Sequence, residues 1–313
     1  MALTSHPLGS TKLNVSSIGL GTVEIGLPYG IGVTTLPTDK EADRILKTAV
    51  DLGITYFDTA HSYGVAEERI GRSGIARLPQ IVIGTKCAQF LEKGQDPRGP
   101  ELEQAIRSEV EESLRRLRTD SLQLLQLHGG SAEQLERGEL IDILRRIKDE
   151  GKIQHIGIAT RGTDAPLAAI ETNFFSTIQT AYSILDQRMA AQVFPAAFAS
   201  NIGIINRSVL LKGALTSSVW HLPPALDPLK ENSAQAAAIA KKLSTDLPSL
   251  AIRFATSHPA VSTILIGTIE PRHLHSALSA IKEGPLSPPV LGKLSNLAIA
   301  DPNLVDPAHW PSV

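Results

Sequence analysis

Cysteine is almost absent from this sequence, because Cys87 is the only one in 313 residues. A single thiol excludes any disulfide within the chain and is typical of a reducing compartment. No apolar run approaches the roughly 18 residues of a membrane span. The first seven residues also lack the basic and apolar regions of a signal peptide. Together these absences predict a cytoplasmic chain that does not enter a membrane.

An excess of either charge is also lacking, since 30 lysines and arginines face 32 aspartates and glutamates, for a net charge of -2. Such a balance gives no bulk attraction to nucleic acid or to an anionic membrane. Apolar residues make up 42 % of the chain, enough for one large core. The length suits a barrel of about 250 residues with extensions, so we expect one domain over residues 1–313. The sequence does not predict the oligomeric state.

Short apolar runs alternate with longer stretches of helical spacing along most of the chain. Leu13 and Val15 alternate with polar neighbours after a Gly9-Ser10 turn, which predicts an N-terminal hairpin. Strand–helix alternation implies parallel strands, and eight repeats imply closure into an α/β fold, a (β/α)8 barrel. The eight expected strands are residues 18–20, 55–57, 81–85, 122–127, 156–159, 177–181, 202–205 and 263–266.

The second half of the chain is less regular. Residues 217–228 contain Trp220 and several prolines and are expected to form a long loop of the kind that often covers a site. The proline-rich tail from Gly284 is expected to pack over one end of the barrel as a C-terminal extension. In the first half, Asp39 is the expected N-terminal cap of the first long helix.

Four polar residues follow consecutive strands in the first half: Asp58, Tyr63, Lys86 and His128. Each has an ordinary structural explanation, as a capping aspartate, a packed loop tyrosine, a solvated lysine and a capping histidine. Their shared position at strand ends favours a functional explanation, because a parallel barrel carries its active site at that end.

The chemistry of these four side chains is mutually consistent. A free tyrosine has a pKa of about 10, too high for efficient proton transfer at neutral pH. The ammonium of Lys86 is expected to lower it, and Asp58 supplies the counter-charge that a buried ammonium needs. His128 can hydrogen-bond a substrate carbonyl. The set is therefore predicted to protonate a carbonyl while hydride arrives from a cofactor.

Several motifs resemble those of the aldo-keto reductases. Residues 58–64, Asp-Thr-Ala-His-Ser-Tyr-Gly, resemble the signature of that family. Similar matches occur at residues 67–71, 84–86, 126–128, 151–153, 156–158 and 264–267. The resemblance implies a (β/α)8 barrel with a nicotinamide cofactor across its C-terminal mouth. It also implies Tyr63 as general acid/base, Lys86 and Asp58 as its tuning pair, and His128 as the residue that orients the carbonyl.

The same resemblance suggests where cofactor and substrate bind. The cofactor-binding candidates are Gly21, Thr22, Asp58, Thr160, Gln179, Arg207, Ser208, Leu210, Lys212, Gly267, Thr268, Arg272 and His273. The substrate candidates are Tyr29, Tyr63, His128 and Trp220, and no metal ligand is expected. Two positions depart from the family pattern, because Ala159-Thr160 replaces a frequent Ser-Asn pair and Arg207 replaces an aromatic residue that often stacks on the nicotinamide.

Family habit and Arg272 favour NADP(H) over NAD(H). The usual lysine, arginine and Glu-Asn pair correspond here to Gly267, His273 and Ser276-Ala277, so the discrimination is expected to be modest. Three other motifs are set aside. Glu24 occupies the third glycine position of a dinucleotide fingerprint, His273 and His275 are spaced wrongly for a shared metal, and Cys87 is better explained as a packed residue than as an oxidant sensor.

The predicted function is an NAD(P)(H)-dependent oxidoreductase that interconverts an alcohol and the carbonyl of a small aldehyde, ketone or sugar. The reaction direction stays open, because the weak NADPH pattern also resembles the family's sugar dehydrogenases. Two alternatives remain at this point. One is a regulatory cofactor-binding subunit resembling the cytoplasmic subunits of potassium channels, and the other is a structural barrel with relic residues.

Overall fold

Eight parallel strands close into a barrel in the order β10-β3-β4-β5-β6-β7-β8-β9. The computed structural model describes residues 3–30 and 32–311. All eight predicted strands are present, and the predicted (β/α)8 fold is confirmed. Their bounds are β3 Ile18–Gly21, β4 Tyr56–Asp58, β5 Val82–Cys87, β6 Leu122–His128, β7 Ile153–Ala159, β8 Thr177–Ala181, β9 Gly203–Arg207 and β10 Val261–Gly267.

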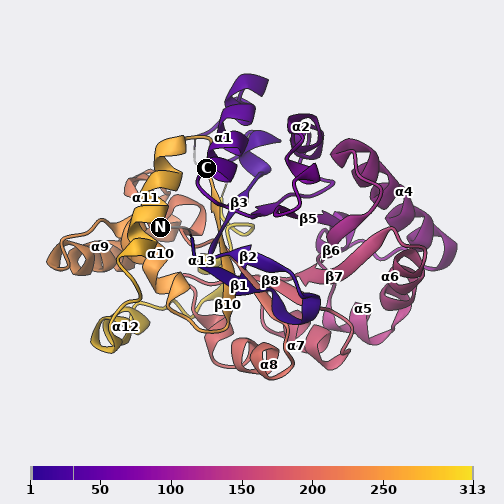
Figure 1. The fold of residues 1–313 in the computed structure, drawn as a ribbon. Coiled ribbons are helices and arrows are strands. Elements are labelled where there is room, and N and C mark those ends of the chain that lie inside the picture. Colours follow the sequence, from indigo (N-terminus) through magenta and orange to yellow (C-terminus); the bar gives the residue numbers. More distant parts are fainter. Residues whose placement is uncertain (1–2, 31, 312–313) are drawn as a thin grey trace.

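Helices surround the barrel as an outer ring (Figure 1). They are α1 Asp39–Asp51, α2 Ala66–Ser73, α3 Gln89–Glu92, α4 Gly99–Leu117, α5 Ala132–Glu136, α6 Glu139–Asp149, α7 Asp164–Glu171, α8 Val193–Ala199, α9 Asp227–Lys242, α10 Leu247–Thr256, α11 Pro271–Lys282, α12 Pro288–Ser295 and α13 Pro302–Val305. Over the described part of the chain, no helix combines the length and apolarity needed to cross a membrane.

The start of α1 differs from the prediction by one residue. Thr38, not Asp39, caps the helix, because its hydroxyl accepts from the Glu41 backbone N–H while the Glu41 carboxylate accepts from the Thr38 backbone N–H. Asp39 instead binds the guanidinium groups of Arg69 and Arg72 on α2 at 2.7 and 2.8 Å. A threonine and an aspartate both suit a cap, so the neighbouring helix decides between them.

The N-terminal hairpin closes the bottom of the barrel. Strands β1 (Ser5–Pro7) and β2 (Asn14–Ser16) pair antiparallel, as predicted. Leu8 and Val15 are fully buried and pack with inward-facing barrel residues that include Tyr56 and Leu124. The hairpin lies on the side of the barrel that faces the reader in Figure 1. This end of the barrel is therefore sealed by apolar side chains.

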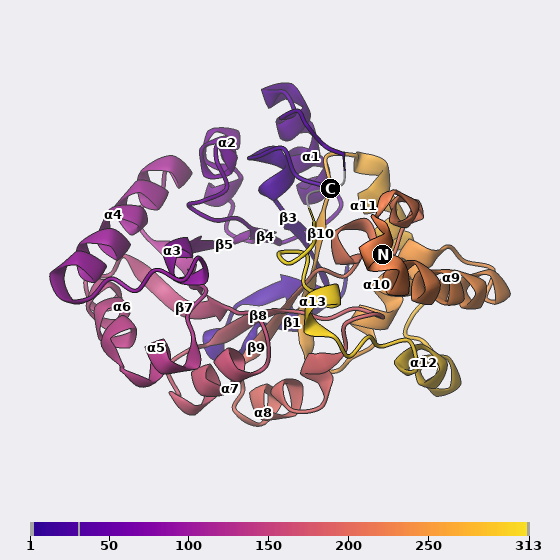
Figure 2. The same ribbon diagram turned by 180° about the vertical axis from the view of Figure 1, so that it is seen from behind.

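The C-terminal tail packs at the opposite end. The backbone N–H of Ile299 donates to the Leu185 carbonyl at 2.9 Å, and the Gln187 amide donates to the Leu294 carbonyl at 3.0 Å. Both partners lie in the loop that follows β8, at the C-terminal end of the strands. Figure 2 shows α13 near the centre of this face. The tail therefore borders the mouth of the barrel.

The prediction of a long loop at residues 217–228 is wrong. The segment forms two 3-10 helices, Ser217–His221 and Pro224–Leu226, and α9 begins at Asp227. Its apolar residues Val219, Leu222 and Leu226 are buried, which explains why it folds into short helices and does not form an open loop. The prolines that indicated a loop stand in the first turns of helices, where their missing N–H has no cost.

Truncating the hairpin side chain Leu8 to alanine should destabilise the barrel without affecting catalysis. The change removes a fully buried side chain and leaves a cavity, which costs about 2–5 kcal/mol of unfolding free energy. Urea unfolding measures this cost, and Leu13→Ala, at a partly exposed position of the same hairpin, should cost clearly less. A large loss of kcat/KM in folded Leu8→Ala would contradict the separation of the two barrel ends.

Candidate active site

Asp58 and Lys86 form a buried ion pair at the mouth of the barrel. Asp58 ends β4, and Lys86 lies near the end of the neighbouring β5. The Lys86 ammonium donates to Asp58 Oδ2 at 2.5 Å and to the Thr59 carbonyl at 2.9 Å. Burial lowers the pKa of Lys86, and the adjacent Asp58 carboxylate opposes that change. The pairing predicted from the sequence is present in the structure.

Two glutamine amides also donate to the Asp58 carboxylate. Gln179 Nε2, from β8, lies 2.6 Å from Asp58 Oδ1, and Gln126 Nε2, from β6, lies 3.4 Å from the same atom. All three side chains are buried. Gln126 was missed by the sequence analysis, although its position two residues before His128 puts both side chains on the inward face of the strand.

Tyr63 and His128 complete the cluster. The Lys86 ammonium lies 4.9 Å from the centre of the Tyr63 ring. The Tyr63 and His128 rings meet edge to face with centres 5.8 Å apart. Ser62 Oγ lies 3.4 Å from His128 Nδ1 and helps to fix the imidazole. The structure thus brings together all four residues that the sequence singled out.

The protonation of Tyr63 differs from the expected trend. Burial, followed by the nearby Asp58 carboxylate, raises the pKa of Tyr63 above its usual value. The prediction that Lys86 lowers this pKa therefore does not describe the site without its ligands, because desolvation of the phenolate dominates. Burial, followed by the Lys86 charge, lowers the pKa of His128 to about 2. At neutral pH the site holds a neutral phenol and a neutral imidazole, both of which can donate a hydrogen bond.

The first two cofactor candidates lie beside Asp58. Gly21 ends β3 and is in register with Asp58 on one side and Gly267 on the other. The Thr22 hydroxyl donates to the Asp58 carbonyl at 2.8 Å. Thr160 follows β7, and its buried hydroxyl has no hydrogen-bond partner among the described residues.

Arg207 ends β9 and is partly buried. Its guanidinium donates from Nη2 to the Thr160 carbonyl at 3.0 Å and from Nη1 to Ser208 Oγ at 3.2 Å. The chain then runs through left-handed residues, because Ser208, Leu211 and Lys212 have φ angles of 61°, 45° and 51°. Backbone of this kind forms concave N–H surfaces that bind anions. Leu210, within this turn, packs partly buried against the core.

The remaining cofactor candidates follow β10. The Thr268 hydroxyl lies 2.9 Å from His273 Nδ1 on α11. Arg272 has 78 % of its side chain exposed, and its Nε lies 4.0 Å from the Glu270 carboxylate. Gly267 is exposed, and a Cβ added there would collide with the Glu24 carboxyl group. The sequence analysis missed this contact because the two residues are far apart in the chain.

Glu24 is a half-buried acid beside Gly267. Its Oε2 atom is buried without a hydrogen-bond partner among the described residues. Burial, opposed by a backbone hydrogen bond and reinforced by Asp58, raises the pKa of Glu24 to about 7. Tyr29, a substrate candidate, is 42 % exposed. Trp220 is 65 % exposed, in the segment after β9.

A second charged network links the tail to the mouth. The Arg161 guanidinium donates from Nε to Glu92 at 2.6 Å and from Nη1 to Asp306 at 3.1 Å. Glu92 Oε2 in turn lies 3.9 Å from His128 Nε2. The three residues come from α3, from the loop after β7 and from the tail. No sequence motif indicated this network.

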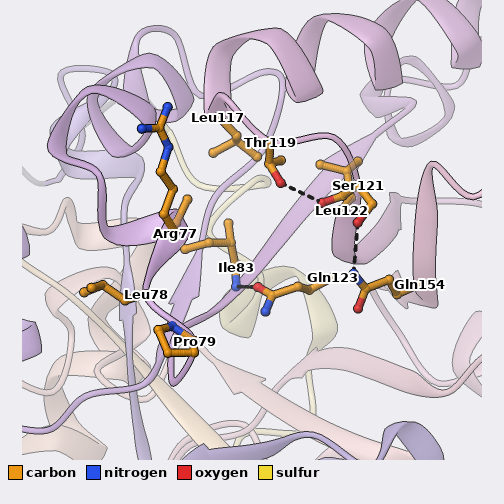
Figure 3. Close-up of a pocket in the computed structure, with 11 residues that line it drawn as sticks. Arg77, Leu78, Pro79, Ile83, Leu117, Thr119, Ser121, Leu122, Gln123 and Gln154 are labelled. Atoms are coloured by element: carbon orange, nitrogen blue, oxygen red, sulfur yellow. Dashed lines mark hydrogen bonds between the residues drawn. The ribbon is translucent and has the colours of Figure 1, made fainter.

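Other candidates lie apart from this cluster. The cavity in Figure 3, of about 230 Å³, is bordered by Pro79, Thr119 and Gln154 near the start of β5 and β6, at the opposite end of the strands from Lys86 and His128. Cys87 is buried, and burial raises the pKa of its thiol, as a packed cysteine requires. The described residues contain no group of three or more His, Cys, Asp or Glu side chains that could hold a metal ion.

The sequence of the chain matches a family model. The Aldo/keto reductase family model matches residues 17–299, which include all eight barrel strands. The chain belongs to the aldo/keto reductase family. The resemblance noted at residues 58–64 and in the later motifs is therefore confirmed, and the chain is a member of an oxidoreductase family.

Individual family members match at modest identity. L-galactose dehydrogenase from Arabidopsis thaliana is 28 % identical over 292 residues, covering 88 % of this chain and 87 % of the relative. The NADH-specific methylglyoxal reductase of Escherichia coli is 26 % identical over 307 residues, covering 88 % and 92 %. The structure of aldo-keto reductase AKR11C1 from Bacillus halodurans, in its holo form, matches with a TM-score of 0.78 at 27 % identity, covering 98 % and 99 %.

Replacing Glu24 by glutamine should remove part of the pH dependence of stability of this family member. The folded pKa of about 7 exceeds the ordinary value of 4.5, so the folded state holds a proton that the unfolded state loses. Stability from this group is full below pH 4.5 and is lost as the pH rises through 7. The unfolding free energy of the native protein relative to Glu24→Gln should therefore fall by about 2 kcal/mol between pH 5 and pH 8.

Urea titrations at both pH values measure that difference. Glu68→Gln, at an exposed position of α2, is the matched control. A difference that stays constant with pH would show that Glu24 is ionised throughout.

Proposed function

We propose that the protein is an NAD(P)(H)-dependent oxidoreductase that interconverts small carbonyl compounds and alcohols. The observation that carries this proposal is the protonated phenol of Tyr63 beside the buried Lys86–Asp58 pair and the neutral His128. These groups supply a proton donor and a second hydrogen-bond donor for one carbonyl oxygen. Aldehydes, ketones and open-chain sugars share that group.

Tyr63 is assigned the proton transfer to the carbonyl oxygen. The neutral imidazole of His128 donates a hydrogen bond to the same oxygen and so orients the substrate. The Lys86 ammonium lies 4.9 Å from the centre of the Tyr63 ring, where its charge stabilises the phenolate that proton transfer leaves behind. Asp58 keeps this buried ammonium charged. In the reverse direction the same phenol exchanges the proton of an alcohol, since general acid and base are one group.

The chain's donor set fits a nicotinamide cofactor. The unpartnered Thr160 hydroxyl and the Gln179 amide suit a carboxamide, which needs both a donor and an acceptor. The left-handed turn through Ser208, Leu211 and Lys212 suits a diphosphate. When bound, the cofactor supplies or accepts the hydride. Gly21 and Thr22 border the same region.

For the cofactor we favour NADP(H) over NAD(H), with modest discrimination. Arg272 is exposed in the first turn of α11, and a guanidinium there suits a ribose phosphate. Gly267 contributes no charge, and His273 is held by Thr268. Glu24 has a pKa of about 7, so it carries a full negative charge, which would repel a phosphate, only at alkaline pH.

The two other functions have less support. A regulatory subunit is not favoured, because the relatives reported above are named as a dehydrogenase and reductases. A structural barrel with relic residues does not explain the Thr160 hydroxyl and the Glu24 Oε2 atom, which are buried at the mouth without a partner among the described residues. The deciding experiment mixes the protein with NADPH or NADH and a panel of aldehydes and ketones, and then with NADP⁺ or NAD⁺ and aldoses. Absence of turnover with every pair would contradict the proposal.

The Tyr63→Phe variant should lose turnover and keep cofactor binding. The phenol is assigned only to proton transfer, which is worth about 10²–10⁴ in rate. Steady-state kinetics with the best substrate of the panel measures the loss, and fluorescence titration measures the cofactor affinity. The removed hydroxyl has no hydrogen bond among the described residues, so the fold should survive. Native turnover in this variant would refute the assignment of the proton donor.

The Arg272→Ala variant should bring the two cofactors closer together, mainly by weakening NADPH. One charge-assisted contact is worth about 1.5–3 kcal/mol, or about one to two decades of affinity. The measurement is the ratio of kcat/KM for NADPH and NADH in the native protein and in the variant. A native preference for NADH, or a ratio that the mutation does not change, would argue against NADP(H).

A further inference from the structure

Arg207 is a cation inside the barrel mouth without a carboxylate partner among the described residues. Along β9 the side chain of Ile205 belongs to the barrel interior, so Arg207, two residues later, also faces inward. Its guanidinium bonds to the Thr160 carbonyl and the Ser208 hydroxyl, which are both neutral. No described carboxylate lies within 4.0 Å of it.

Other arginines at this end of the barrel are neutralised. Arg161 pairs with Glu92 and Asp306, and Arg188 pairs with Asp186 at 2.8 Å. A partly buried charge is costly unless something compensates for it. The positive charge of Arg207 is therefore not compensated by its two neutral hydrogen-bond partners.

Arg207 lies next to the place where the reaction occurs. Arg207 stands at the end of β9, and its guanidinium reaches the Thr160 carbonyl, which follows β7. The side chain therefore extends across the end of β8, the strand that carries Gln179. Gln179 touches Asp58, and the positive charge of Arg207 acts on the phenol of Tyr63 and the imidazole of His128. Tyr63 and His128 form one side of the mouth, and Thr160, Gln179 and Arg207 form another.

The chemistry of the proposed function limits where the nicotinamide can lie. A carbonyl that takes a proton from Tyr63 must have its carbon about 3–3.5 Å from the hydride donor. The ring must therefore enter the mouth beside Tyr63, against the side made by Thr160, Gln179 and Arg207. An oxidised nicotinamide ring is positively charged, and a reduced one is neutral.

We propose that Arg207 makes this site bind the reduced nicotinamide cofactor more tightly than the oxidised form. The inference rests on the proposed function and adds to it which redox form of the cofactor the site prefers. The fixed guanidinium repels the charged ring and leaves the neutral ring unaffected. In a partly buried site such repulsion amounts to about one to two decades in affinity.

Binding measurements test this without turnover. Isothermal titration gives the Kd of NADPH, NADP⁺, NADH and NAD⁺ for the native protein and for Arg207→Gln and Arg207→Lys. For the native protein, each oxidised form should bind about tenfold to a hundredfold more weakly than its reduced partner. Arg207→Gln should remove most of that difference by tightening the oxidised forms, and Arg207→Lys should keep part of it.

Arg115→Gln is the control. It removes a guanidinium that is exposed on α4 in the outer ring and paired with Glu112, so the ratio of oxidised to reduced Kd should stay near the native value. Circular dichroism and thermal unfolding confirm that each variant is folded.

Two outcomes would overturn the inference. The native protein could bind both redox forms equally, or Arg207→Gln could leave their ratio unchanged. Equal weakening of both forms in Arg207→Gln would identify Arg207 as a phosphate contact. An unchanged ratio with a raised KM only for carboxylate-bearing substrates would identify it as a substrate-carboxylate receptor. Failure of the native protein to bind any of the four cofactors would instead refute the proposed function itself.

Discussion

The carboxylate of Asp58 holds the mouth of the barrel together. It accepts hydrogen bonds from side chains on three other strands, because Lys86, Gln126 and Gln179 all donate to its two oxygen atoms. A buried carboxylate can be kept only when it is paired and hydrogen-bonded, so the positions of these donors depend on one another. Tyr63 packs against this cluster through Lys86, which fixes the phenol relative to the strand ends.

The barrel interior is divided along its axis. One end is filled by the hairpin residues Leu8 and Val15 against apolar strand residues such as Tyr56. The other end holds ionisable and amide side chains and is bordered by the tail through Arg161 and Asp306. The hairpin end is therefore apolar, and the unpartnered polar groups lie at the mouth, where the chemistry is proposed.

Much of this structure could be predicted from the sequence, because the relevant physics is local. Apolar runs bounded by polar residues located all eight strands, and parallel pairing then brought Asp58, Lys86 and His128 together. The features that the sequence did not predict depend on contacts between segments that are distant in the chain. The choice of Thr38 as cap depends on Asp39 meeting α2, the end on which the tail packs depends on loops around Leu185, and the Glu24 contact depends on two strands being neighbours.

The contact between Glu24 and Gly267 restricts how this protein can change. The carboxyl group lies where any side chain at position 267 would begin, so even alanine would collide there. A lysine at 267, the residue that is usual in the family pattern, fits only if the Glu24 carboxyl group moves aside or is replaced by a smaller group. Geometry therefore couples the two positions. Evolution or protein engineering that starts from this sequence has to treat the acid and the glycine as one pair.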